Sequence, residues 1–465
     1  MSTYNKINRE TLVALEAVVG AEYVLTAPEI LDKYKTDEET NPRYFHIPEV
    51  VVIPGTTQEI AEIVKLANKF LVPITVRGAG TSLSDGAIAV CGGIVLLMER
   101  MNKILSFDEE GMYMVVEAGV STKAIQDIAN SKKLLYAGDP CSAESCMIGG
   151  NLATNAGGNK AVRYGTTRDQ VYALEVVTPT GDIVNMGARL QKKTTGYCLE
   201  QLLMGSEGTL GIITKATLKL KPLPPYRFDI LAIFTDVTKA IDLVPKIIKA
   251  GVTPTSIEFM DNNFVRSTND YCETRLPHYE DGSYIIITVE TLTEDELDIK
   301  MELLDSLCTE SGAAEVLEAD ERVWNLRRNC QESVRIISKV NLTDDVVVPL
   351  DKEAETIKFV MSTGKNYNLH VMTLAHAGDG NLHICLCKGD LSDEQWDKEV
   401  AEFHAEIYAY AYKVGGRLSG EHGIGAKKIK ELEKYTEPSE LAVMKTIKKA
   451  MDPNNILNPG KVVFM

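Results

Sequence analysis

The sequence lacks several features that would place it in a large class of proteins. No apolar run approaches the ~18 residues of a membrane-spanning helix, and a typical run, Ile94 to Met98, has the length of a strand. The N-terminus has no apolar signal region, which argues against export. Positive charge is in deficit, because 49 Lys and Arg stand against 66 Asp and Glu, a formal net charge of −17. Such a surface repels phosphate backbones, so we expect no nucleic-acid binding.

The cysteines do not show the regular spacing of a disulfide-bonded protein. The nine cysteines are irregularly spaced and fit reduced thiols better than disulfides. No C-x-x-C series occurs, so we expect no iron–sulfur cluster within the chain. Cys385 and Cys387 would share one face of a strand, either as a redox or metal pair or, more commonly, as core thiols. The sequence therefore predicts a cytoplasmic, multidomain protein, and it leaves a homo-oligomer open.

The order of helix and strand patterns predicts several domains. A strand at 49–54 precedes a helix at 57–68, whose apolar residues recur at one-face spacing behind a Thr N-cap candidate. A proline cluster at 222–225 is typical of a linker, and 226–372 then alternates β-like and helix-like runs. We expect an N-terminal helical segment at 1–44, a first domain at 45–225, a second at 226–415 and a C-terminal segment at 416–465.

Three glycine-rich patches indicate a long anionic ligand. The loop Gly78-Ala-Gly-Thr-Ser-Leu83 follows a strand but lacks the third glycine of the nicotinamide-dinucleotide pattern. Its backbone N–H groups suit a pyrophosphate. The stretch 138–165, with two Gly-Gly pairs, and the patch Gly205 to Ile213 repeat this chemistry, since small residues let the main chain lie against a flat ligand. A diphosphate joined to a ring system, as in FAD, fits all three patches.

A second constellation combines histidine with glutamate. His376 and His383 flank an Asp379-Gly380 turn, which would let the two imidazoles converge on one site. A histidine pair alone is more often structural. Glu421 and His422, however, are bracketed by glycines, an arrangement of little value in a core. Two histidines and one glutamate form a known ligand set for Zn²⁺ and similar ions, which leaves His422 as a base.

The patches Val76 to Leu83, Ile148 to Gly158 and Gly205 to Ile212 resemble those of the vanillyl-alcohol-oxidase and p-cresol-methylhydroxylase type of FAD-binding proteins. More narrowly, from about residue 40 to the C-terminus, the chain resembles the D-lactate/glycolate/D-2-hydroxyglutarate dehydrogenase branch. The resemblance implies an α+β fold. An FAD-binding domain would be followed by an α+β substrate (cap) domain with an antiparallel sheet, and a C-terminal helical return would lead back to the flavin and the active site.

The resemblance also implies which residues contact the cofactor. No histidine stands between His46 and His278, so the FAD should be non-covalent. The candidate cofactor contacts are Arg77, Gly78, Ala79, Gly80, Thr81, Ser82, Gly86, Pro140, Gly149, Gly150, Asn151, Thr154, Asn155, Gly157, Gly158, Tyr164, Gly165, Gly208, Ile212 and Asn458.

By the same resemblance, His376, His383 and Glu421 would bind a divalent metal, and His422 would take the hydroxyl proton of the substrate. Zn²⁺, Mn²⁺ and Fe²⁺ all tolerate such ligands. Arg327 would bind the substrate carboxylate, although without the resemblance a helix-surface arginine is the commoner interpretation.

The chain departs from the 2-hydroxyglutarate enzymes nearby. Gln331 and Cys385 stand where those enzymes carry substrate-contacting Thr and Asn, and no Lys occurs between Lys339 and Lys352. The chain thus offers few groups to bind the second carboxylate of a substrate such as 2-hydroxyglutarate, which favours small substrates such as lactate or glycolate.

The expected function is therefore oxidation of a D-2-hydroxy acid to the 2-oxo acid, with lactate as the leading candidate substrate. The α-hydride would pass to flavin and the electrons to a separate protein such as electron transfer flavoprotein, for which a stable complex is one form. Alternatives are a glycolate or other 2-hydroxy-acid dehydrogenase or oxidase, an alkyl-ether-lipid synthase of the same fold, and a non-catalytic flavin carrier subunit. A carrier should lack the intact His–His–Glu–His set.

Overall fold

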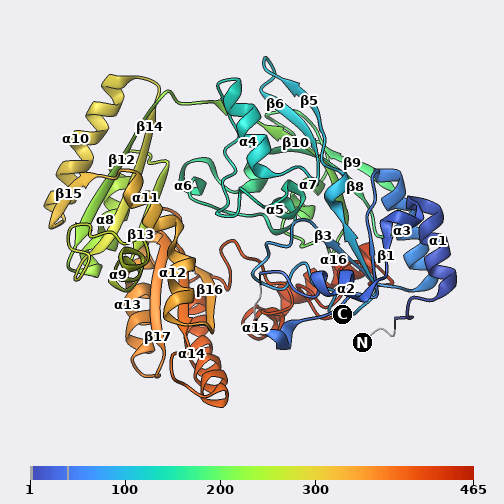
Figure 1. The fold of residues 1–465 in the computed structure, drawn as a ribbon. Helices are drawn as coiled ribbons and strands as arrows, with labels where there is room; N and C mark the ends of the chain where they lie inside the picture. Colours follow the sequence, from blue (N-terminus) through green and yellow to red (C-terminus); the bar gives the residue numbers. More distant parts are fainter. Residues whose placement is uncertain (1–3, 39–40) are drawn as a thin grey trace. The chain divides into compact units, whose positions relative to one another are not determined.

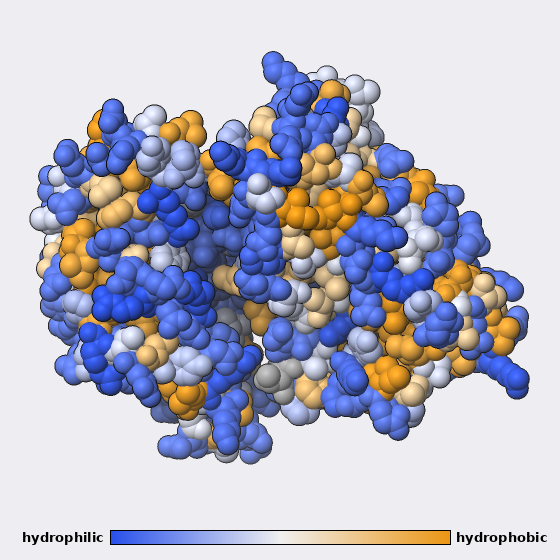
Figure 2. Space-filling view, turned by 45° about the horizontal axis from the view of Figure 1, so that its top comes forward, coloured by the Kyte–Doolittle hydropathy of each residue, from blue (hydrophilic) through white to orange (hydrophobic). Residues whose placement is uncertain are grey.

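A computed structural model describes residues 4–38 and 41–465, and the chain forms two units (Figure 1). The first unit consists of residues 1–157, 165–223 and 421–465, and the second of residues 158–164 and 224–420. Residues 1–3 and 39–40 of the expected N-terminal segment lie outside the described residues. Among the residues that are described, no helix is long and apolar enough to cross a membrane. Hydrophilic side chains cover most of the visible face of each unit (Figure 2).

The first unit combines small sheets with peripheral helices. Its helices are α1 (Arg9–Val19), α2 (Pro28–Leu31), α3 (Thr57–Phe70), α4 (Thr122–Ser131), α5 (Ile148–Thr154), α7 (Leu199–Leu203), α15 (Ile429–Tyr435) and α16 (Pro438–Met451), with 3-10 turns η1 (Ala21–Tyr23), η2 (Asp32–Tyr34), η3 (Pro42–Tyr44), η4 (Met98–Arg100) and η5 (Thr167–Gln170). Its strands are β1 (Val24–Leu25), β2 (Val50–Val52), β3 (Ile74–Arg77), β4 (Ile94–Leu97), β5 (Ile104–Asp108), β6 (Tyr113–Glu117), β7 (Leu134–Leu135), β8 (Val171–Val177), β9 (Ile183–Gly187), β10 (Ile212–Lys219) and β11 (Lys221–Pro222).

These strands form three sheets. The four-stranded sheet has the order β1-β2-β4-β3, in which β4 pairs in parallel with both β2 and β3. The five-stranded sheet has the order β5-β6-β10-β8-β9 and is antiparallel throughout. Strands β11 and β7 form a short third sheet.

Helix α3 shows how the sequence dictates an element of the first unit. Its N-cap is Thr56, whose side chain accepts a hydrogen bond from the amide of Glu59. Ile60 and Val64 lie one helical turn apart and are fully buried in the core of the four-stranded sheet. The left-handed backbone of Leu71 ends the helix and leads into β3. The sequence-based prediction of a helix at 57–68 is confirmed.

The second unit is built on one sheet. Its strands are β12 (Tyr226–Phe234), β13 (Ser256–Met260), β14 (Ser283–Thr291), β15 (Glu315–Glu318), β16 (Asn341–Val347), β17 (His370–His376) and β18 (Asn381–Cys387). Its helices are α6 (Ala161–Tyr164), α8 (Val237–Lys249), α9 (Asn262–Tyr271), α10 (Glu294–Glu310), α11 (Glu321–Arg328), α12 (Cys330–Ile337), α13 (Glu353–Gly364) and α14 (Asp393–Lys413), with the 3-10 turn η6 (Leu350–Lys352).

The seven strands run in the order β15-β12-β14-β13-β17-β18-β16, and every pairing is antiparallel. Strand β14 is buried along its whole length, which requires cover on both faces of the sheet. Helices α9, α11 and α12 pack on one face through an apolar cluster that includes Phe264, Leu326 and Val334. The chain thus has the predicted α+β fold, with helices packed on an antiparallel sheet.

Candidate functional site

The glycine-rich patches of the sequence come together around one cavity of about 310 Å³ in the first unit. This volume lies within the range of small-molecule sites. The predicted cofactor contacts that line it are Gly78, Ala79, Gly80, Thr81, Ser82, Gly86, Pro140, Gly149, Gly150, Asn151, Thr154, Gly208 and Ile212. A Cβ atom added at Gly150 would meet no atom within 4 Å, so the main chain is open to the cavity there.

The loop after β3 is braced from behind by Arg77. Its guanidinium donates hydrogen bonds to the carbonyl oxygens of Thr36 and Ala87, at 2.8 and 3.4 Å. Gly80 has φ +79°, and a Cβ atom at this position would overlap the guanidinium of Arg77. The loop therefore needs a glycine here, and Arg77 supports the cavity wall without being part of its lining.

Other predicted contacts also lie outside the lining. The side-chain oxygen of Asn155 accepts hydrogen bonds from Thr166 Oγ1 and from the amide of Arg168. The side-chain amide of Asn458 donates hydrogen bonds to the carbonyl oxygens of Gly86 and Glu207. Asn458 therefore connects two loops of the lining without being part of it. Gly157, Gly165, Gly158 and Tyr164 are outside the lining too, and the last two belong to the second unit.

Sequence reasoning missed part of the lining. The missed residues include Glu38, Val76, Leu83, Ala87, Met98, Ala118, Cys141, Ser142, Ser145, Met147, Ala153, Ala156, Ser206, Glu207, Gly211 and Ile213. Most of them lie within the glycine-rich patches Val76 to Leu83, 138–165 and Gly205 to Ile213, without having been named individually as contacts. The lining residues outside these patches, which have no pattern of their own, are Glu38, Ala87, Met98 and Ala118. The run from Cys141 to Met147 could have been found from its position between Pro140 and the glycine pair at 149–150, because a chain that links two lining segments has little room to leave the cavity.

Glu421 and His422 line the same cavity as the glycine-rich loops. The carbonyl oxygen of His422 accepts a hydrogen bond of 2.9 Å from Ser84 Oγ. Gly425 has φ +53°, and a Cβ atom there would overlap the carbonyl oxygen of Ser84. Gly425 is thus required by close contact with the loop around Ser84.

A buried carboxylate anchors the same segment. Glu207 accepts hydrogen bonds of 2.7 Å from the amides of both Ile424 and Gly425. Burial raises the pKa of Glu207, and the two amides and nearby lysines offset that rise only in part. The segment after His422 is therefore fixed to the cavity wall at two successive amides.

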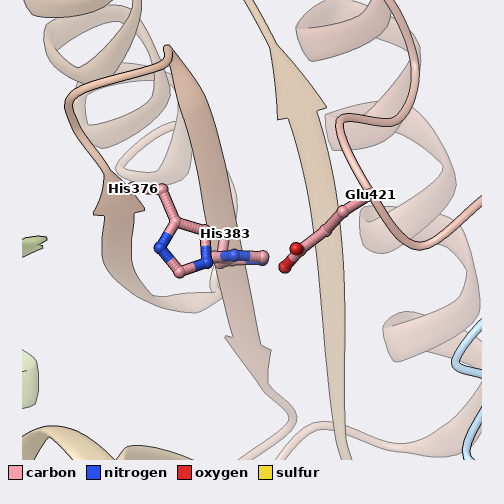
Figure 3. Close-up of side chains that lie close together, drawn as sticks. All are labelled: His376, His383 and Glu421. Atoms are coloured by element: carbon pink, nitrogen blue, oxygen red, sulfur yellow. The ribbon is translucent and has the colours of Figure 1, made fainter. Parts of the chain in front are cut away.

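In the second unit, a hairpin carries the two candidate metal-ligating histidines. His376 ends β17 and pairs with Asn381, while His383 on β18 pairs with Leu374. The turn between the strands places both imidazoles on one face, with ring centroids 5.2 Å apart and planes at 85° (Figure 3). Both side chains are buried. The expectation that the Asp379-Gly380 turn lets the two rings converge is confirmed.

The chain continues from this hairpin sheet into Glu421 through Gly420. The amide of Gly420 donates a 2.7 Å hydrogen bond to Asp345 Oδ2 on β16, beside His383. Glu421 follows by one peptide bond. One ligand atom from each of His376, His383 and Glu421 lies within 4.8 Å of the others. Two imidazoles and a carboxylate are a donor set that suits a divalent cation.

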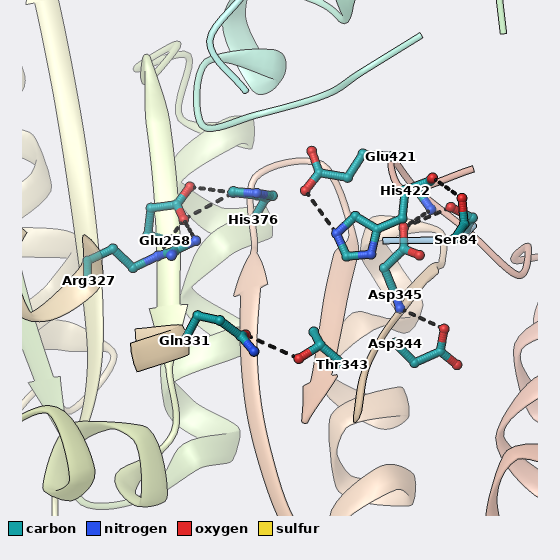
Figure 4. Close-up of polar contacts among 12 residues, drawn as sticks. Ser84, Glu258, Arg327, Gln331, Thr343, Asp344, Asp345, His376, Glu421 and His422 are labelled. Carbon is teal, nitrogen blue, oxygen red and sulfur yellow. Dashed lines mark hydrogen bonds and ion pairs between the residues drawn. The ribbon is translucent and has the colours of Figure 1, made fainter. Parts of the chain in front are cut away.

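Behind His376 lies a buried ion pair that the sequence did not reveal (Figure 4). Glu258, on β13, accepts hydrogen bonds from Arg327 Nε and Nη2 at 3.0 and 2.7 Å. The same carboxylate contacts His376 Nδ1 at 2.8 and 3.0 Å. Burial alone would raise the pKa of Glu258, but the charges and hydrogen bonds of His376 and Arg327 outweigh it and lower that pKa.

A neutral polar contact lies next to Arg327. Thr343 on β16 donates a hydrogen bond of 3.2 Å to Gln331 on α12. Cys385 is the register partner of Thr343, and both Cys385 and Cys387 belong to the apolar cluster beneath α9, α11 and α12. A hydrogen bond with Cys387 and burial raise the pKa of the Cys385 thiol. This packing agrees with the interpretation of the pair as core thiols.

Comparison with known proteins places this geometry in a family. Residues 48–187 match the model of the FAD binding domain, and residues 223–462 match that of the C-terminal domain of FAD linked oxidases. The chain is 36% identical to a D-lactate dehydrogenase of Anaerostipes hadrus, over 99% of this chain and 98% of that protein. It is 35% identical to the glycolate oxidase subunit GlcD of Bacillus subtilis, over 91% of each.

Solved structures agree on the fold. That of p-cresol methylhydroxylase matches with a TM-score of 0.84 at 17% identity, over 100% of this chain and 99% of that one. At this identity the likeness concerns the fold alone. The sequence relatives and the two family models show that the chain belongs to the FAD-linked oxidoreductases of the D-lactate dehydrogenase and glycolate oxidase family.

Proposed function

We propose that the protein is a dehydrogenase that oxidises a D-2-hydroxy acid to the corresponding 2-oxo acid, with lactate as the leading candidate substrate. The observation that carries this proposal is that Glu421 and His422 line the same cavity as the glycine-rich loops. Acid–base groups and a cofactor-sized cavity are therefore joined in one unit. The proposal of a D substrate is supported by the 36% identity to a protein named D-lactate dehydrogenase.

The cavity residues fit a non-covalently bound FAD. The amides and hydroxyls of the loop Gly78 to Ser82 suit the pyrophosphate, and the small residues of α5 let the main chain approach a flat ring. When bound, FAD supplies the acceptor of the α-hydride. The cavity lining among the described residues includes no histidine other than His422, so the loops offer no second imidazole for a covalent link.

His422 is the proposed base for the substrate hydroxyl. Oxidation of a 2-hydroxy acid requires loss of the hydroxyl proton, and an imidazole is suited to accept it near neutral pH. The backbone of His422 is held by Ser84, and the next residues are held by Glu207. A base on such a fixed segment keeps a constant position relative to the cavity, which is what proton transfer requires.

His376, His383 and Glu421 are the proposed ligands of a divalent cation, with Zn²⁺, Mn²⁺ and Fe²⁺ as the candidates. A bound cation supplies Lewis-acid stabilisation of the substrate oxygens. The support for this ligand set is the proximity of the three donor atoms and the burial of both imidazoles.

Arg327 is the proposed anchor of the substrate carboxylate. Its side chain is nearly buried, and Glu258 fixes the orientation of its guanidinium. The neighbouring Gln331–Thr343 contact is uncharged. A substrate with a second carboxylate would meet no counter-charge at this contact, so we propose lactate or glycolate in preference to 2-hydroxyglutarate.

We also propose that the electrons leave to a separate carrier, electron transfer flavoprotein, in the cytoplasm. No C-x-x-C series that would bind an iron–sulfur cluster occurs in the sequence. With no such cluster as an internal relay, the electrons would pass from the flavin directly to an external acceptor. Reduction of purified electron transfer flavoprotein, compared with cytochrome c and a soluble quinone, tests this choice directly.

The experiment for substrate and reaction class is a set of steady-state assays with an artificial electron acceptor. D-lactate, L-lactate, glycolate and D-2-hydroxyglutarate are compared by kcat/KM, and oxygen uptake is followed in parallel. We expect the highest kcat/KM with D-lactate and little oxygen uptake. A preference for D-2-hydroxyglutarate would contradict the proposed anchor, and rapid peroxide formation would make the protein an oxidase.

A further inference from the structure

Glu258 is an unusual residue for its position. It lies in the middle of β13, a strand buried along its whole length, and its side chain is completely inaccessible to solvent. A lone ionised carboxylate at such a site is strongly disfavoured, so its partners must compensate for the lost hydration. The structure provides two cationic or proton-donating partners, His376 on the neighbouring strand β17 and Arg327 on α11.

The contact with His376 determines which nitrogen of the imidazole faces the hairpin. An ionised carboxylate only accepts hydrogen bonds, so Nδ1 of His376 must carry the proton in the 2.8 Å contact with Glu258 Oε1. In the neutral ring, Nε2 then carries the lone pair that a metal needs. Carboxylate–histidine pairs of this kind orient metal-ligating imidazoles and raise their basicity.

The contact of Glu258 with Arg327 orients the residue that is proposed to bind the substrate carboxylate. Both hydrogen bonds from the guanidinium end on the same oxygen, Oε2 of Glu258. Two donors on one acceptor fix the plane of the guanidinium and its distance from His376. A single carboxylate therefore connects the residue proposed to bind metal with the residue proposed to bind the substrate carboxylate.

Stability alone does not account for this arrangement. A buried ion pair costs desolvation that its attraction often only just repays, and apolar replacements of such pairs are frequently neutral or stabilising. The surrounding strand positions of β13, including Ile257 and Phe259, are apolar and well packed. A Glu at position 258 is thus expected where its orientation of other groups matters.

We propose that Glu258 is a positioning residue that sets His376 for metal binding and Arg327 for substrate binding at the same time. The inference rests on the proposed function, because it takes the metal at His376 and the carboxylate anchor at Arg327 from that proposal. Its distinctive consequence is that one substitution at a residue which touches neither metal nor substrate weakens the binding of both.

The test uses the Glu258→Gln variant of the full-length flavoprotein. Gln keeps the size of the side chain, but it carries no charge and only one of its two terminal atoms is an oxygen that accepts hydrogen bonds. The hydrogen bonds that His376 and Arg327 now share between the two carboxylate oxygens can then no longer all form. Zn²⁺ and Mn²⁺ affinity is measured by competition with a chelator in the absence of substrate, and KM and kcat for D-lactate are measured separately. We expect metal affinity to fall by about 10–100-fold, the range typical of second-layer carboxylates, and KM to rise.

Two further variants make the test specific. Glu353→Gln is the matched control, since Glu353 is also a fully buried glutamate of the second unit. It is expected to leave the metal affinity and KM unchanged. Glu258→Asp retains the charge, and we expect it to keep more of the metal affinity than Glu258→Gln; if the Gln variant does not fold, Glu258→Asp is compared with Glu353→Gln in its place.

The outcomes separate this inference from the proposed function. Weaker metal binding together with a raised KM in Glu258→Gln alone supports the inference. Wild-type metal binding that depends on His376 but is the same in Glu258→Gln overturns the inference and leaves the proposed ligand set intact. A wild-type protein that binds no metal, or a His376→Ala variant that retains it, overturns the ligand set and the inference with it.

Discussion

The carboxylate of Asp345 accepts a hydrogen bond of 2.7 Å from the amide of Gly420, the residue that immediately precedes Glu421. Asp345 lies on β16, where its register partner is His383. Its Oδ2 atom also accepts a hydrogen bond of 2.9 Å from Ser419 Oγ. One buried side chain therefore fixes the start of the Glu421–His422 segment to the strand beside a candidate metal ligand.

Substitution of Asp345 should act through this tether. In Asp345→Asn, the oxygen that accepts both hydrogen bonds loses its negative charge, so both bonds weaken and Glu421 and His422 should be held less firmly. We expect lower metal affinity and lower kcat with an unchanged content of FAD, because the glycine-rich loops are not altered. Ser419→Ala removes one of the two hydrogen bonds and should have a smaller effect. Equal FAD loss in both variants would indicate a general structural role instead.

His422 should be dispensable for cofactor binding but not for turnover. We expect His422→Asn to retain FAD and to lose about 10²–10⁴-fold in kcat, the usual contribution of a general base. The measurements are the flavin absorbance of the purified variant and its steady-state rate with D-lactate. His278→Asn is the control, because His278 lies in a turn before β14, where it contacts Asp281. Normal turnover of His422→Asn would remove this residue as the base.

Gly425 should be required for the shape of its segment. In Gly425→Ala, the added Cβ would overlap the carbonyl of Ser84 at a residue with φ +53°. We expect a loss of thermal stability, and weaker retention of FAD because the loop around Ser84 borders the cavity. Gly196→Ala provides the control, since its φ of +75° imposes a similar backbone strain but no atom lies within 4 Å. Its cost should be limited to about 1 kcal/mol of left-handed backbone strain.

If Gly425→Ala and Gly196→Ala lower the unfolding temperature equally, close contact with Ser84 is not what requires the glycine. The stability of each variant is measured by thermal unfolding followed by circular dichroism. FAD retention is measured after gel filtration.

Much of this architecture is predictable from local patterns. The helix at 57–70 has a Thr cap and a one-face apolar repeat, and the run Tyr284 to Val289 is apolar apart from Thr288; the first is a helix and the second lies within a strand, as their patterns predict. The glycine-rich loops converge on one cavity, as the repetition of the same glycine and hydroxyl chemistry in three patches predicts. The convergence of His376 and His383 follows from a turn placed between them.

Glu258 and Asp345 could not be predicted in the same way. The pairing of Glu258 with Arg327 joins residues 69 positions apart and requires the strand order of the finished sheet. The position of Asp345 beside His383 depends on the register of β16 with β18. Such contacts are set by tertiary packing and leave no periodic signal. The one available hint is a charged residue within an apolar strand, as at position 258.

Glu353 should make the stability of the protein depend on pH. Burial, with a further effect from the charge of Asp379, raises the pKa of Glu353 well above its ordinary value. The folded protein then holds a proton that the unfolded chain releases, so this residue costs stability as pH rises above the ordinary carboxyl range. Glu353→Gln should gain stability relative to the wild type between acid and neutral pH. Denaturant unfolding at pH 5 and pH 8 measures the difference, and an equal difference at both values would contradict it.

The most direct test of the proposed function is the visible spectrum of the purified protein without oxygen, before and after D-lactate is added. We predict an oxidised flavin band that bleaches when D-lactate is added and stays unchanged when L-lactate is added. A flavin band that persists with D-lactate, glycolate and D-2-hydroxyglutarate alike would contradict the assignment as a 2-hydroxy-acid dehydrogenase.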